Sequence, residues 1–356
     1  MREKLQFLFA LLIFSFAVGY CPAQEKKASG QAQPDEKKTE DRIEVNGLFL
    51  TPDGKTLIKT KRNYIRTVEI PDQVKIIRGG AFRSCTQLQQ IEIPDSVEEI
   101  GIAAFVGCFN LEEVKLPKNL KIVSAYLFNN CQNLREITLP DSVEEIGEGA
   151  FWYSGLQQIT IPRSVKKIGG KALLGIEEVI LDPEQKNFVL DEHGVLIDQK
   201  QKILVFAPQT LAGTYEVPEG IETIGNGAFY RCSRLNKIVL PESVKTIEAD
   251  AFNKCRGLYE VVFSNGLKKI DFQAFAYCRE LTVITLPDTV EEIQKNAFRS
   301  CINLSEIRIS NSMQLVHKDA FYNCKNLHHV IVPQIISYKK LSEWRIPGKK
   351  VSRPKN

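Results

Sequence analysis

Hydrophobic residues recur along this chain at a fixed interval of 23 positions. Phenylalanine marks the interval most clearly, in two series that each keep the spacing throughout. The first series is Phe82, Phe105, Phe128 and Phe151, and the second is Phe229, Phe252, Phe275, Phe298 and Phe321. Cysteine and proline follow the same interval. A period in the twenties predicts a solenoid, in which each repeat forms one coil and packs against its neighbours.

The consensus of one repeat, L-x-x-I-x-I-P-x-S-V-x-x-I-G-x-x-A-F-x-x-C-x-x-L, predicts the shape of a coil. In I-x-I, alternation turns two side chains inward from a short strand, and the proline ends that strand because it cannot donate to a ladder. The V-x-x-I segment, the Ala-Phe pair and the Cys turn further sides inward. A single coil cannot bury these side chains, whereas stacked coils can. We expect about ten coils whose outward strand positions face solvent.

The repeat is interrupted at residues 181–214, and the interruption has a counterpart at the start of the chain. Gly47 and Gly194 each begin an apolar segment that leads through a polar turn, Pro52-Asp53-Gly54 in the first case, to a second apolar segment. Such patterns predict hairpins. The first hairpin is expected to cap the open edge of the first coil. The second is a hinge, a bend or a remnant of duplication, and the sequence does not choose among these.

The C-terminal segment departs from the repeat as well. Tyr338, Leu341 and Trp344 recur at three-residue spacing. They predict one short helical turn that lays all three side chains over the last coil.

The N-terminal residues predict export. Arg2 and Lys4 precede an apolar run at 5–20 that is short for a membrane span, and we place cleavage of a signal peptide after Ala23. A lipid anchor at Cys21 is the alternative, although Tyr20 stands where a lipobox has a small residue. Either route predicts a secreted or cell-surface protein, and no later segment is expected to span a membrane.

The chain therefore divides into five predicted segments. Residues 1–23 are the signal peptide, and residues 24–42, with five basic and five acidic side chains, are a disordered tether. Residues 43–180 hold the first hairpin and repeat block, and residues 181–333 the second hairpin and repeat block. Residues 334–356 form a C-terminal cap and a basic tail.

The combination of I-x-I-P, S-V-x-x-I-G and A-F-x-x-C resembles the BspA-type leucine-rich repeat of bacterial surface proteins. The resemblance covers about residues 43–345. It implies a β-rich leucine-rich-repeat solenoid with short helical turns. It also implies an exported or surface-bound protein associated with adhesion to host matrix proteins, other bacteria or glycans. The family has no catalytic motif to transfer, so we assign no catalytic, metal or cofactor residue.

Composition and charge exclude several other classes. The chain is 43% hydrophobic and 25% charged, as in soluble globular proteins, and a net charge of +4 is too weak to indicate a nucleic-acid surface. Eight cysteines follow the repeat interval, which predicts a ladder of buried, reduced thiols, because Cβ atoms on parallel neighbouring coils lie too far apart for a disulfide. With four histidines and no C-x₂-C cluster, a metal site or an enzyme is not expected.

Two sets of outward positions are candidates for ligand binding. Aromatic residues between Phe and Cys of a coil are expected to face outward, and Trp and Tyr are favoured interface anchors. Local packing against an irregular neighbouring coil is the competing interpretation for the Trp152-Tyr153 pair. Later coils place two valines at outward strand positions, which indicates an interaction patch. The candidates are Trp152, Tyr153, Tyr230, Tyr277, Val239 and Val262.

These patterns predict an exported or cell-surface binding protein with no cofactor and no enzymatic activity. Its expected partner is a protein, such as host extracellular matrix or a component of another cell surface. The alternative is a surface glycan-binding protein that uses the aromatic residues around Trp152. A nucleic-acid partner is not expected.

Overall fold

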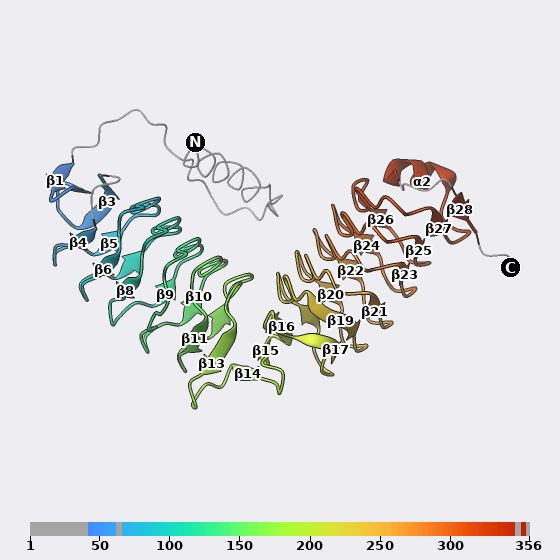
Figure 1. Ribbon diagram of the computed structural model, residues 1–356, viewed down its shortest axis with the longest axis horizontal. Coiled ribbons are helices and arrows are strands. Elements are labelled where there is room, and N and C mark those ends of the chain that lie inside the picture. The colour runs from blue at the N-terminus through green and yellow to red at the C-terminus, as the bar shows by residue number, and fades with distance from the viewer. Residues whose placement is uncertain (1–41, 62–65, 346–349, 354–356) are drawn as a thin grey trace. The chain divides into compact units, whose positions relative to one another are not determined.

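The computed structural model describes residues 42–61, 66–345 and 350–353. The predicted signal peptide, Cys21 and nearly all of the predicted tether lie outside these residues. Within them, short strands stack in sequence order as a solenoid of parallel coils (Figure 1). The stack has about 13 turns, against the ten that the repeats predict. The difference arises because the hairpin strands β3 (Thr56–Thr60) and β16 (Ile203–Phe206) join the same stack and β28 (Lys350–Ser352) extends it beyond the last repeat.

The I-x-I segments form one side of the stack, where the regular strands bury their central residues and turn the flanking ones outward. In the first block these strands are β4 (Thr67–Glu69), β6 (Gln90–Glu92), β8 (Glu113–Lys115), β11 (Gln158–Ile161) and β13 (Glu178–Leu181). In the second block they are β17 (Ala212–Glu216), β19 (Arg234–Val239), β21 (Glu260–Val262), β23 (Val283–Thr285), β25 (Glu306–Arg308), β27 (His329–Ile331) and β28 (Lys350–Ser352).

The V-x-x-I segments form a second side made of two-residue parallel strands. In the first block these are β5 (Ile76–Ile77), β7 (Glu99–Ile100), β9 (Ile122–Val123), β10 (Glu145–Ile146) and β12 (Lys167–Ile168). In the second block they are β18 (Thr223–Ile224), β20 (Thr246–Ile247), β22 (Lys269–Ile270), β24 (Glu292–Ile293) and β26 (Leu315–Val316). The third side, which follows each V-x-x-I strand, consists of the turns that carry the Ala-Phe pair and the cysteine.

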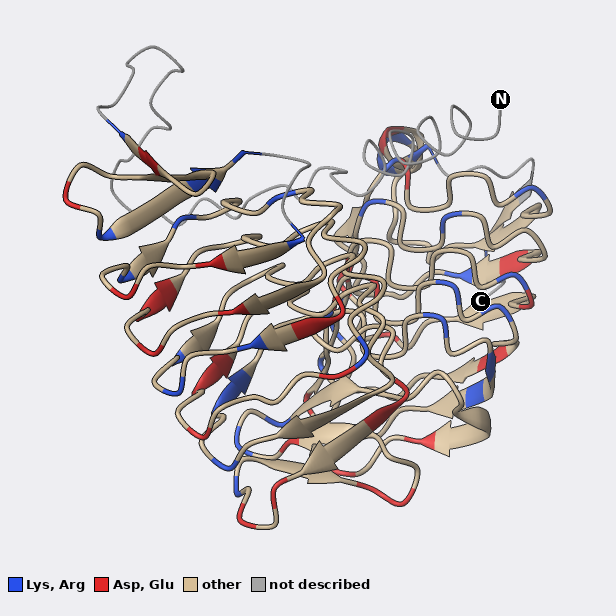
Figure 2. Cartoon of the chain, turned by 60° about the vertical axis from the view of Figure 1, so that its left-hand side comes forward, with Lys and Arg blue, Asp and Glu red and all other residues tan. Residues whose placement is uncertain are grey.

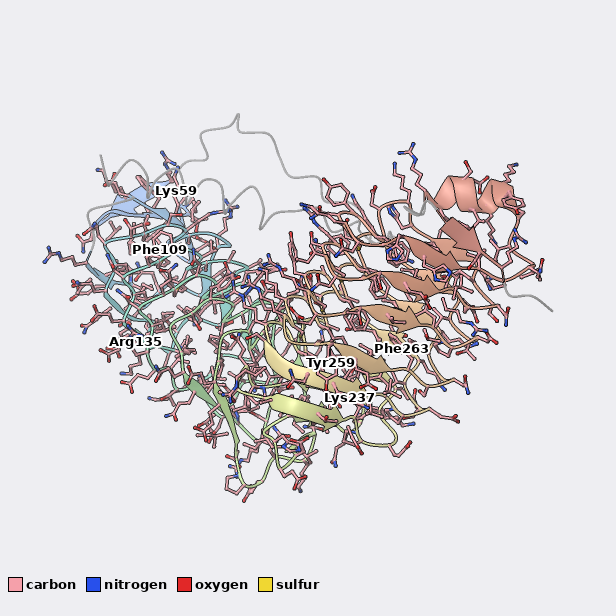
Figure 3. The ribbon with its side chains drawn as sticks, turned by 45° about the vertical axis from the view of Figure 1, so that its right-hand side comes forward. Lys59, Phe109, Arg135, Lys237, Tyr259 and Phe263 are labelled. Atoms are coloured by element: carbon pink, nitrogen blue, oxygen red, sulfur yellow. The ribbon has the colours of Figure 1, made fainter. Side chains whose placement is uncertain are left out.

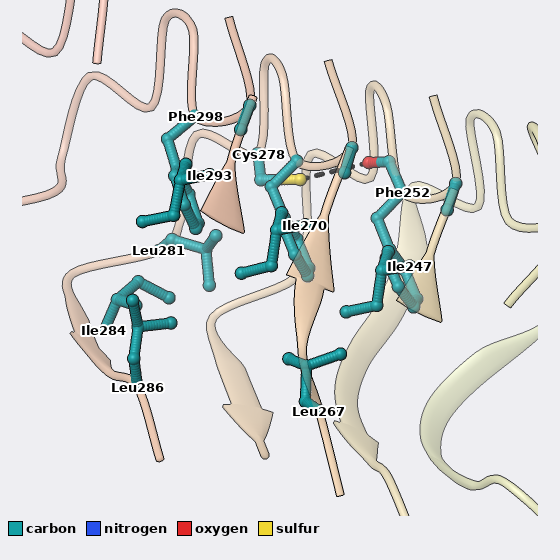
Figure 4. Packing of buried hydrophobic residues seen from close by; sticks show 14 of the residues in the cluster. Ile247, Phe252, Leu267, Ile270, Cys278, Leu281, Ile284, Leu286, Ile293 and Phe298 are labelled. Atoms are coloured by element: carbon teal, nitrogen blue, oxygen red, sulfur yellow. Dashed lines mark hydrogen bonds between the residues drawn. The ribbon is translucent and has the colours of Figure 1, made fainter. Parts of the chain in front are cut away.

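Phenylalanine and cysteine fill the interior as two parallel ladders. Successive phenylalanine rings stack face to face, as in the 5.0 Å separation of the ring centroids of Phe252 and Phe275. The cysteines of the described residues are free and buried, which confirms the predicted thiol ladder. Each thiol in the regular coils donates to the phenylalanine carbonyl of the preceding coil, and the Sγ of Cys278 lies 3.1 Å from the Phe252 oxygen (Figure 4).

Both predicted hairpins are present, and each has one more strand than its sequence pattern indicates. At the start, β1 (Ile43–Val45), β2 (Leu48–Leu50) and β3 are antiparallel, and β3 continues in parallel onto β5. In the interruption, β14 (Phe188–Leu190), β15 (Leu196–Asp198) and β16 repeat this arrangement, and β16 pairs with β18.

The second hairpin is buried on both faces. Leu196 and Phe206 belong to the hydrophobic core of the first block, while Ile197 and Leu204 belong to the core of the second. Since neighbouring residues of a strand point to opposite faces, one strand can serve both cores. The interruption therefore joins the two repeat blocks through buried contacts.

The C-terminal cap is the helix α2 (Tyr338–Trp344), which begins after Ser337, whose side chain accepts a hydrogen bond from the Lys340 amide. Leu341 and Trp344 are buried as predicted, but the expectation for Tyr338 is wrong, because its side chain is 75% exposed. Residues six apart on an α-helix point about 120° apart, so Tyr338 and Trp344 cannot both face the last coil. The ring of Tyr338 instead lies 4.6 Å from the Arg353 guanidinium.

The phenylalanine ladder predicts the effect of a single truncation. Phe105 is fully buried between the rings of Phe82 and Phe128. Phe105→Ala is expected to lower the free energy of unfolding by about 3–5 kcal/mol, because it leaves a cavity in a packed core. Urea unfolding measures this change. Tyr259→Ala, at an exposed ring, is the control and should shift the midpoint far less; equal shifts would contradict the inward assignment.

The thiol ladder predicts a loss of stability at high pH. Burial raises the pKa of Cys131 and of Cys232 to about 12, and it also raises the pKa of Cys108, Cys255 and Cys278. An unfolded thiol titrates near pH 8.5, so above that pH the unfolded state binds fewer protons than the folded one. Stability that is fully present below about pH 8.5 is therefore lost as the pH rises towards 12.

The urea midpoint of the wild type should fall between about pH 9 and pH 11 more steeply than that of Cys131→Ala. Expressed as the free energy of unfolding, the slopes against pH of the two proteins should differ by at most about 1.4 kcal/mol per pH unit, the contribution of one thiol. Identical slopes for the two proteins would contradict the burial of a protonated thiol in this ladder.

Candidate binding surfaces

The strand side of the first block presents charged residues that pair between coils. Lys115 forms an ion pair with Glu92, and the Nζ of Lys118 lies 3.0 Å from the Asp95 carboxylate one coil earlier. Figure 2 shows acidic and basic residues in alternation along these strands. Charges of both signs thus cover this face, and some of them pair between coils.

The corresponding face of the second block carries a group of outward apolar residues between β19 and β23. Val239 and Val262 pair in register, with Val262 37% exposed and Val239 half-buried. Val283 and Tyr259 are more exposed, at 49% and 53%, and Figure 3 shows Tyr259 beside Lys237 on this block. We call Val239, Tyr259, Val262 and Val283 the sheet patch. Sequence reasoning found the two candidate valines but missed Tyr259 and Val283, although Val283 follows Glu260 by one repeat interval.

The sheet patch coincides with an irregular coil. Phe263 takes the place of Leu240 and Leu286, and Ser264 that of the proline. Phe263 is too large to be buried as completely as these leucines, and its ring meets Phe275 edge-on at a centroid distance of 6.0 Å. Strands β21 and β23 consequently belong to separate sheets. This break leaves the outward side chains of the coil exposed.

The turn side brings together three of the predicted aromatic residues. The rings of Trp152 and Tyr153 stack at 5.4 Å, and the hydroxyls of Tyr153 and Tyr230, 77 residues apart, lie 3.3 Å from each other. The expectation that Tyr230 faces outward is wrong, since only 6% of it is exposed. The Arg231 guanidinium covers its ring at 5.6 Å, and the Lys254 ammonium donates to its hydroxyl at 2.8 Å.

The contact between the blocks depends on the short coil before the interruption. On the turn side, the second block stacks directly on this coil, and the Lys171 amide donates to the Asn226 carbonyl at 3.0 Å. The coil lacks both phenylalanine and cysteine and carries Gly175 at the position of Tyr153. With no side chain at Gly175, the Tyr153 ring can reach across to Tyr230. Tyr277 lies two coils beyond Tyr230, half-buried, with the Arg299 guanidinium 5.9 Å from its ring.

A buried ion pair ties the two blocks together at the same place. The Nζ of Lys171 lies 2.5 Å from the Asp250 carboxylate, and the two side chains are only 14% and 8% exposed. The Lys171 side chain passes over the intervening coil at Gly227. A Cβ atom at this position would lie 2.8 Å from the Lys171 Cγ, so the absence of a side chain at Gly227 makes room for the lysine. Asn253 also donates to Asp250, at 2.5 Å. This carboxylate is thus fully engaged within the protein.

The electrostatics of the cluster follow from burial. Burial raises the pKa of Tyr153, and the neighbouring Tyr230 adds to the shift. Burial also lowers the pKa of Lys254. Among the described residues, neither Lys254 nor Arg231 has a carboxylate within ion-pair distance. Sequence reasoning missed these cations because it considered only the aromatic residues between Phe and Cys.

His329 joins three strands near the C-terminus. Its Nδ1 lies 2.6 Å from the Glu306 carboxylate and its Nε2 lies 2.8 Å from the Ser352 hydroxyl. A carboxylate, an imidazole and a hydroxyl linked in this order also make up the catalytic triad of many hydrolases. Here, however, the three residues stand at outward positions of β25, β27 and β28, and the side chains of His329 and Glu306 are more than a third exposed. The bonds hold β28 onto the last coil.

A cavity of about 10 Å³ at the junction, lined by Leu173, Phe206 and Gly227 among others, is too small for anything larger than water. The described parts hold no cluster of three or more His, Cys, Asp or Glu side chains suited to a metal ion. No helix within them has the length and apolar character of a membrane span.

The ion pair at the junction predicts a measurable coupling. Asp250→Asn leaves the buried Lys171 ammonium without a counter-charge and should lower the free energy of unfolding by about 3–5 kcal/mol. Adding Lys171→Met should recover part of that loss, because it removes the unpaired charge. Asp95→Asn, at an exposed pair, is the control and should leave the urea midpoint nearly unchanged. If the two junction substitutions changed the free energy of unfolding in a strictly additive way, Lys171 and Asp250 would not interact, and the ion pair would be contradicted.

Comparison with known proteins identifies relatives of this fold. The profile of a family described as the BspA type leucine-rich repeat region matches residues 60–178 and 209–343. The unmatched stretch between them contains the second hairpin. No curated protein matches the sequence.

Solved structures that share the fold include three bacterial proteins. A leucine-rich cell surface protein of Faecalibacterium prausnitzii has a TM-score of 0.69 at 24% identity, covering 86% of this chain and 98% of that one. The pneumococcal vaccine antigen PcpA has a TM-score of 0.61 at 19% identity, with 83% and 88% covered. A leucine-rich repeat protein of Eubacterium ventriosum has a TM-score of 0.58 at 22% identity, with 83% and 90% covered.

Proposed function

The chain belongs to the BspA-type leucine-rich repeat family of bacterial surface proteins, and on that premise we propose that it is a surface binding protein whose ligand is another protein. Members of the family are typically non-enzymatic surface proteins. The ligand we propose is a host extracellular-matrix protein or a protein of another cell surface, which makes the molecule an adhesin.

The sheet patch is the observation that carries this proposal. Val262, Val283 and Tyr259 gather exposed apolar surface on neighbouring coils of a side whose outward residues are mostly charged or polar. Burying such surface against a partner is favourable by about 25 cal/mol per Å² removed from water. The Lys237–Glu260 ion pair, with Nζ and carboxylate 2.8 Å apart, lies beside the patch and supplies the polar rim that protein interfaces have.

The architecture supports the same use. Each coil is held by its neighbours, so outward residues of adjacent coils keep a fixed spacing and form an extended recognition surface. A partner that binds such a surface does not have to order it, which lowers the entropic cost of association.

Export is part of the proposal. We propose that the signal peptide at residues 1–23 directs the chain out of the cell, to be secreted or retained at the surface. Lipid attachment at Cys21 is the alternative mode of anchoring. Mass spectrometry of the mature protein distinguishes a free N-terminus after Ala23 from a lipidated Cys21.

Glycan capture by Trp152 and Tyr153 is the alternative function. Both rings are half-buried, and they stack on each other and against the second block. These contacts favour the role of a structural bridge between the blocks, which was the competing interpretation of the pair. The protein ligand is therefore the stronger proposal.

The test is binding of the purified protein to immobilised matrix proteins and glycans. We expect saturable binding to a protein that survives moderate salt, and Val262→Asp should weaken it about tenfold or more by placing a charge in the apolar patch. Thr160→Asp, at the equivalent outward position of β11 in the first block, is the matched control and should bind as the wild type does. Equal affinities of the two variants would contradict the sheet patch.

The same panel separates the two functions. Loss of sugar binding in the Trp152→Ala variant, with protein binding retained, would favour the glycan alternative. Binding to glycans alone would overturn the protein proposal.

A further inference from the structure

One position on the turn side has a left-handed backbone in successive coils. It is the second residue after the phenylalanine, a conformation that suits Gly and Asn but disfavours larger side chains. Several coils follow this preference, with Gly107, Asn130 and Asn323 at φ of 73°, 62° and 63°. The coils in the middle of the stack do not: Tyr153, Arg231, Lys254 and Tyr277 have φ of 56°, 63°, 65° and 63°. Large side chains are thus held here against a backbone preference.

Backbone hydrogen bonds place these residues in adjacent coils. The amide of Arg231 donates to the Asn253 carbonyl at 2.9 Å, that of Lys254 to Ala276 at 2.8 Å, and that of Tyr277 to Arg299 at 2.7 Å. The next bond, from Ser300 to Tyr322 at 2.9 Å, continues the series. Cations and tyrosines therefore line one edge of the stack. We call this edge the cation–aromatic stripe; its members are Tyr153, Arg231, Lys254, Tyr277, Arg299 and Tyr322.

The cations of the stripe lack counter-charges. Among the described residues, Arg231, Lys254 and Arg299 have no carboxylate within ion-pair distance. Asp250 on the same edge is buried and already binds Lys171 and Asn253. On the V-x-x-I side, by contrast, Lys167 pairs with Glu145 and Lys269 with Asp271, at 2.7 and 2.9 Å. The stripe thus carries positive charge that the fold leaves uncompensated.

Unpartnered polar atoms concentrate on this edge. Six buried side-chain polar atoms of the described residues have no hydrogen-bond partner, and five belong to these turns: Trp152 Nε1, Ser154 Oγ, Asn226 Oδ1, Asn253 Oδ1 and Arg299 Nε. Buried polar atoms are usually paired within the protein or with water. These buried atoms mark the irregular packing of this edge, and Arg299 is the stripe member among them.

We propose that the cation–aromatic stripe binds an acidic polysaccharide. Its carboxylate or sulfate groups would pair with Arg231 and Lys254, on adjacent coils about 4.8 Å apart, and with Arg299, two coils beyond Lys254. A sugar ring would stack on the ring of Tyr322, which is 56% exposed, while Tyr153 and Tyr277 are half-buried. A narrow line of cations with interleaved aromatic rings fits a single linear polyanion better than a duplex nucleic acid, which is bound by a broad basic surface.

This site goes beyond the proposed protein-binding function. It uses the turn side of the coils and shares no residue with the sheet patch. Val262→Asp should therefore leave polysaccharide binding unchanged, so failure of one proposal is distinguishable from failure of the other.

The experiment measures binding of the whole protein to heparin, which is sulfated, to polygalacturonate, which carries carboxylates alone, and to neutral dextran. We expect binding to one or both acidic polysaccharides that weakens with added salt, and none to dextran. The affinity of the Arg231→Gln, Lys254→Gln double variant for the acidic polysaccharide should fall by about tenfold or more, because charge-assisted contacts are lost. The control is Arg135→Gln, Lys59→Gln, which removes the same charge from exposed sites of the first block and should bind normally (Figure 3).

Unfolding in urea shows whether the double variant retains its fold. If its stability falls, Tyr322→Ala provides an independent test, because this exposed ring lies at the end of the stripe and should weaken polysaccharide binding without a change in charge. Lack of binding to both acidic polysaccharides at low salt would overturn the proposal. So would equal losses in the control variant, or competition by duplex DNA as effective as that by free heparin.

Discussion

The structure depends on the stacking of each coil directly over the one before it. A coil of 23 residues cannot bury its own apolar side chains, so the phenylalanine ring, the thiol and the branched aliphatics of one coil are covered only by the same residues of its neighbours. Stacked rings such as Phe252 and Phe275 record this constraint. Equivalent positions therefore share one environment throughout the stack. The inward positions must stay apolar, whereas the outward ones are free to carry recognition.

At the interruption, residues 181–214, the stacking needs another solution. There β15 serves two cores with its two faces, and Lys171 reaches Asp250 past a glycine, so that the turn side continues from one block to the other. The cation–aromatic stripe depends on that continuity, because Tyr153 belongs to the first block and Arg231 to the second. The sheet patch does not, since it lies wholly within the second block.

The sequence predicts what depends on the repeat and fails where contacts depend on departures from it. The burial of Phe105, the free thiol of Cys278 and the outward placement of Val262 follow from the repeat pattern. The contact of Tyr153 with Tyr230 does not, because it requires the intervening hairpin to fold away from the turn side. The burial of Tyr230 has the same cause. The exposure of Val283 and Tyr259 arises from an irregular coil, whose effect on packing a consensus does not convey.

Trp152 and Trp344 are the only tryptophans, and they report on the junction and on the C-terminal cap. Unfolding in urea, followed by fluorescence in the single-tryptophan variants Trp344→Phe and Trp152→Phe and by circular dichroism, tests most directly whether the two blocks form one continuous stack. Coincident midpoints for both tryptophans and for the backbone signal are the result that joined cores require. Two separate transitions, with the cap and the junction unfolding independently, would contradict the continuous stack.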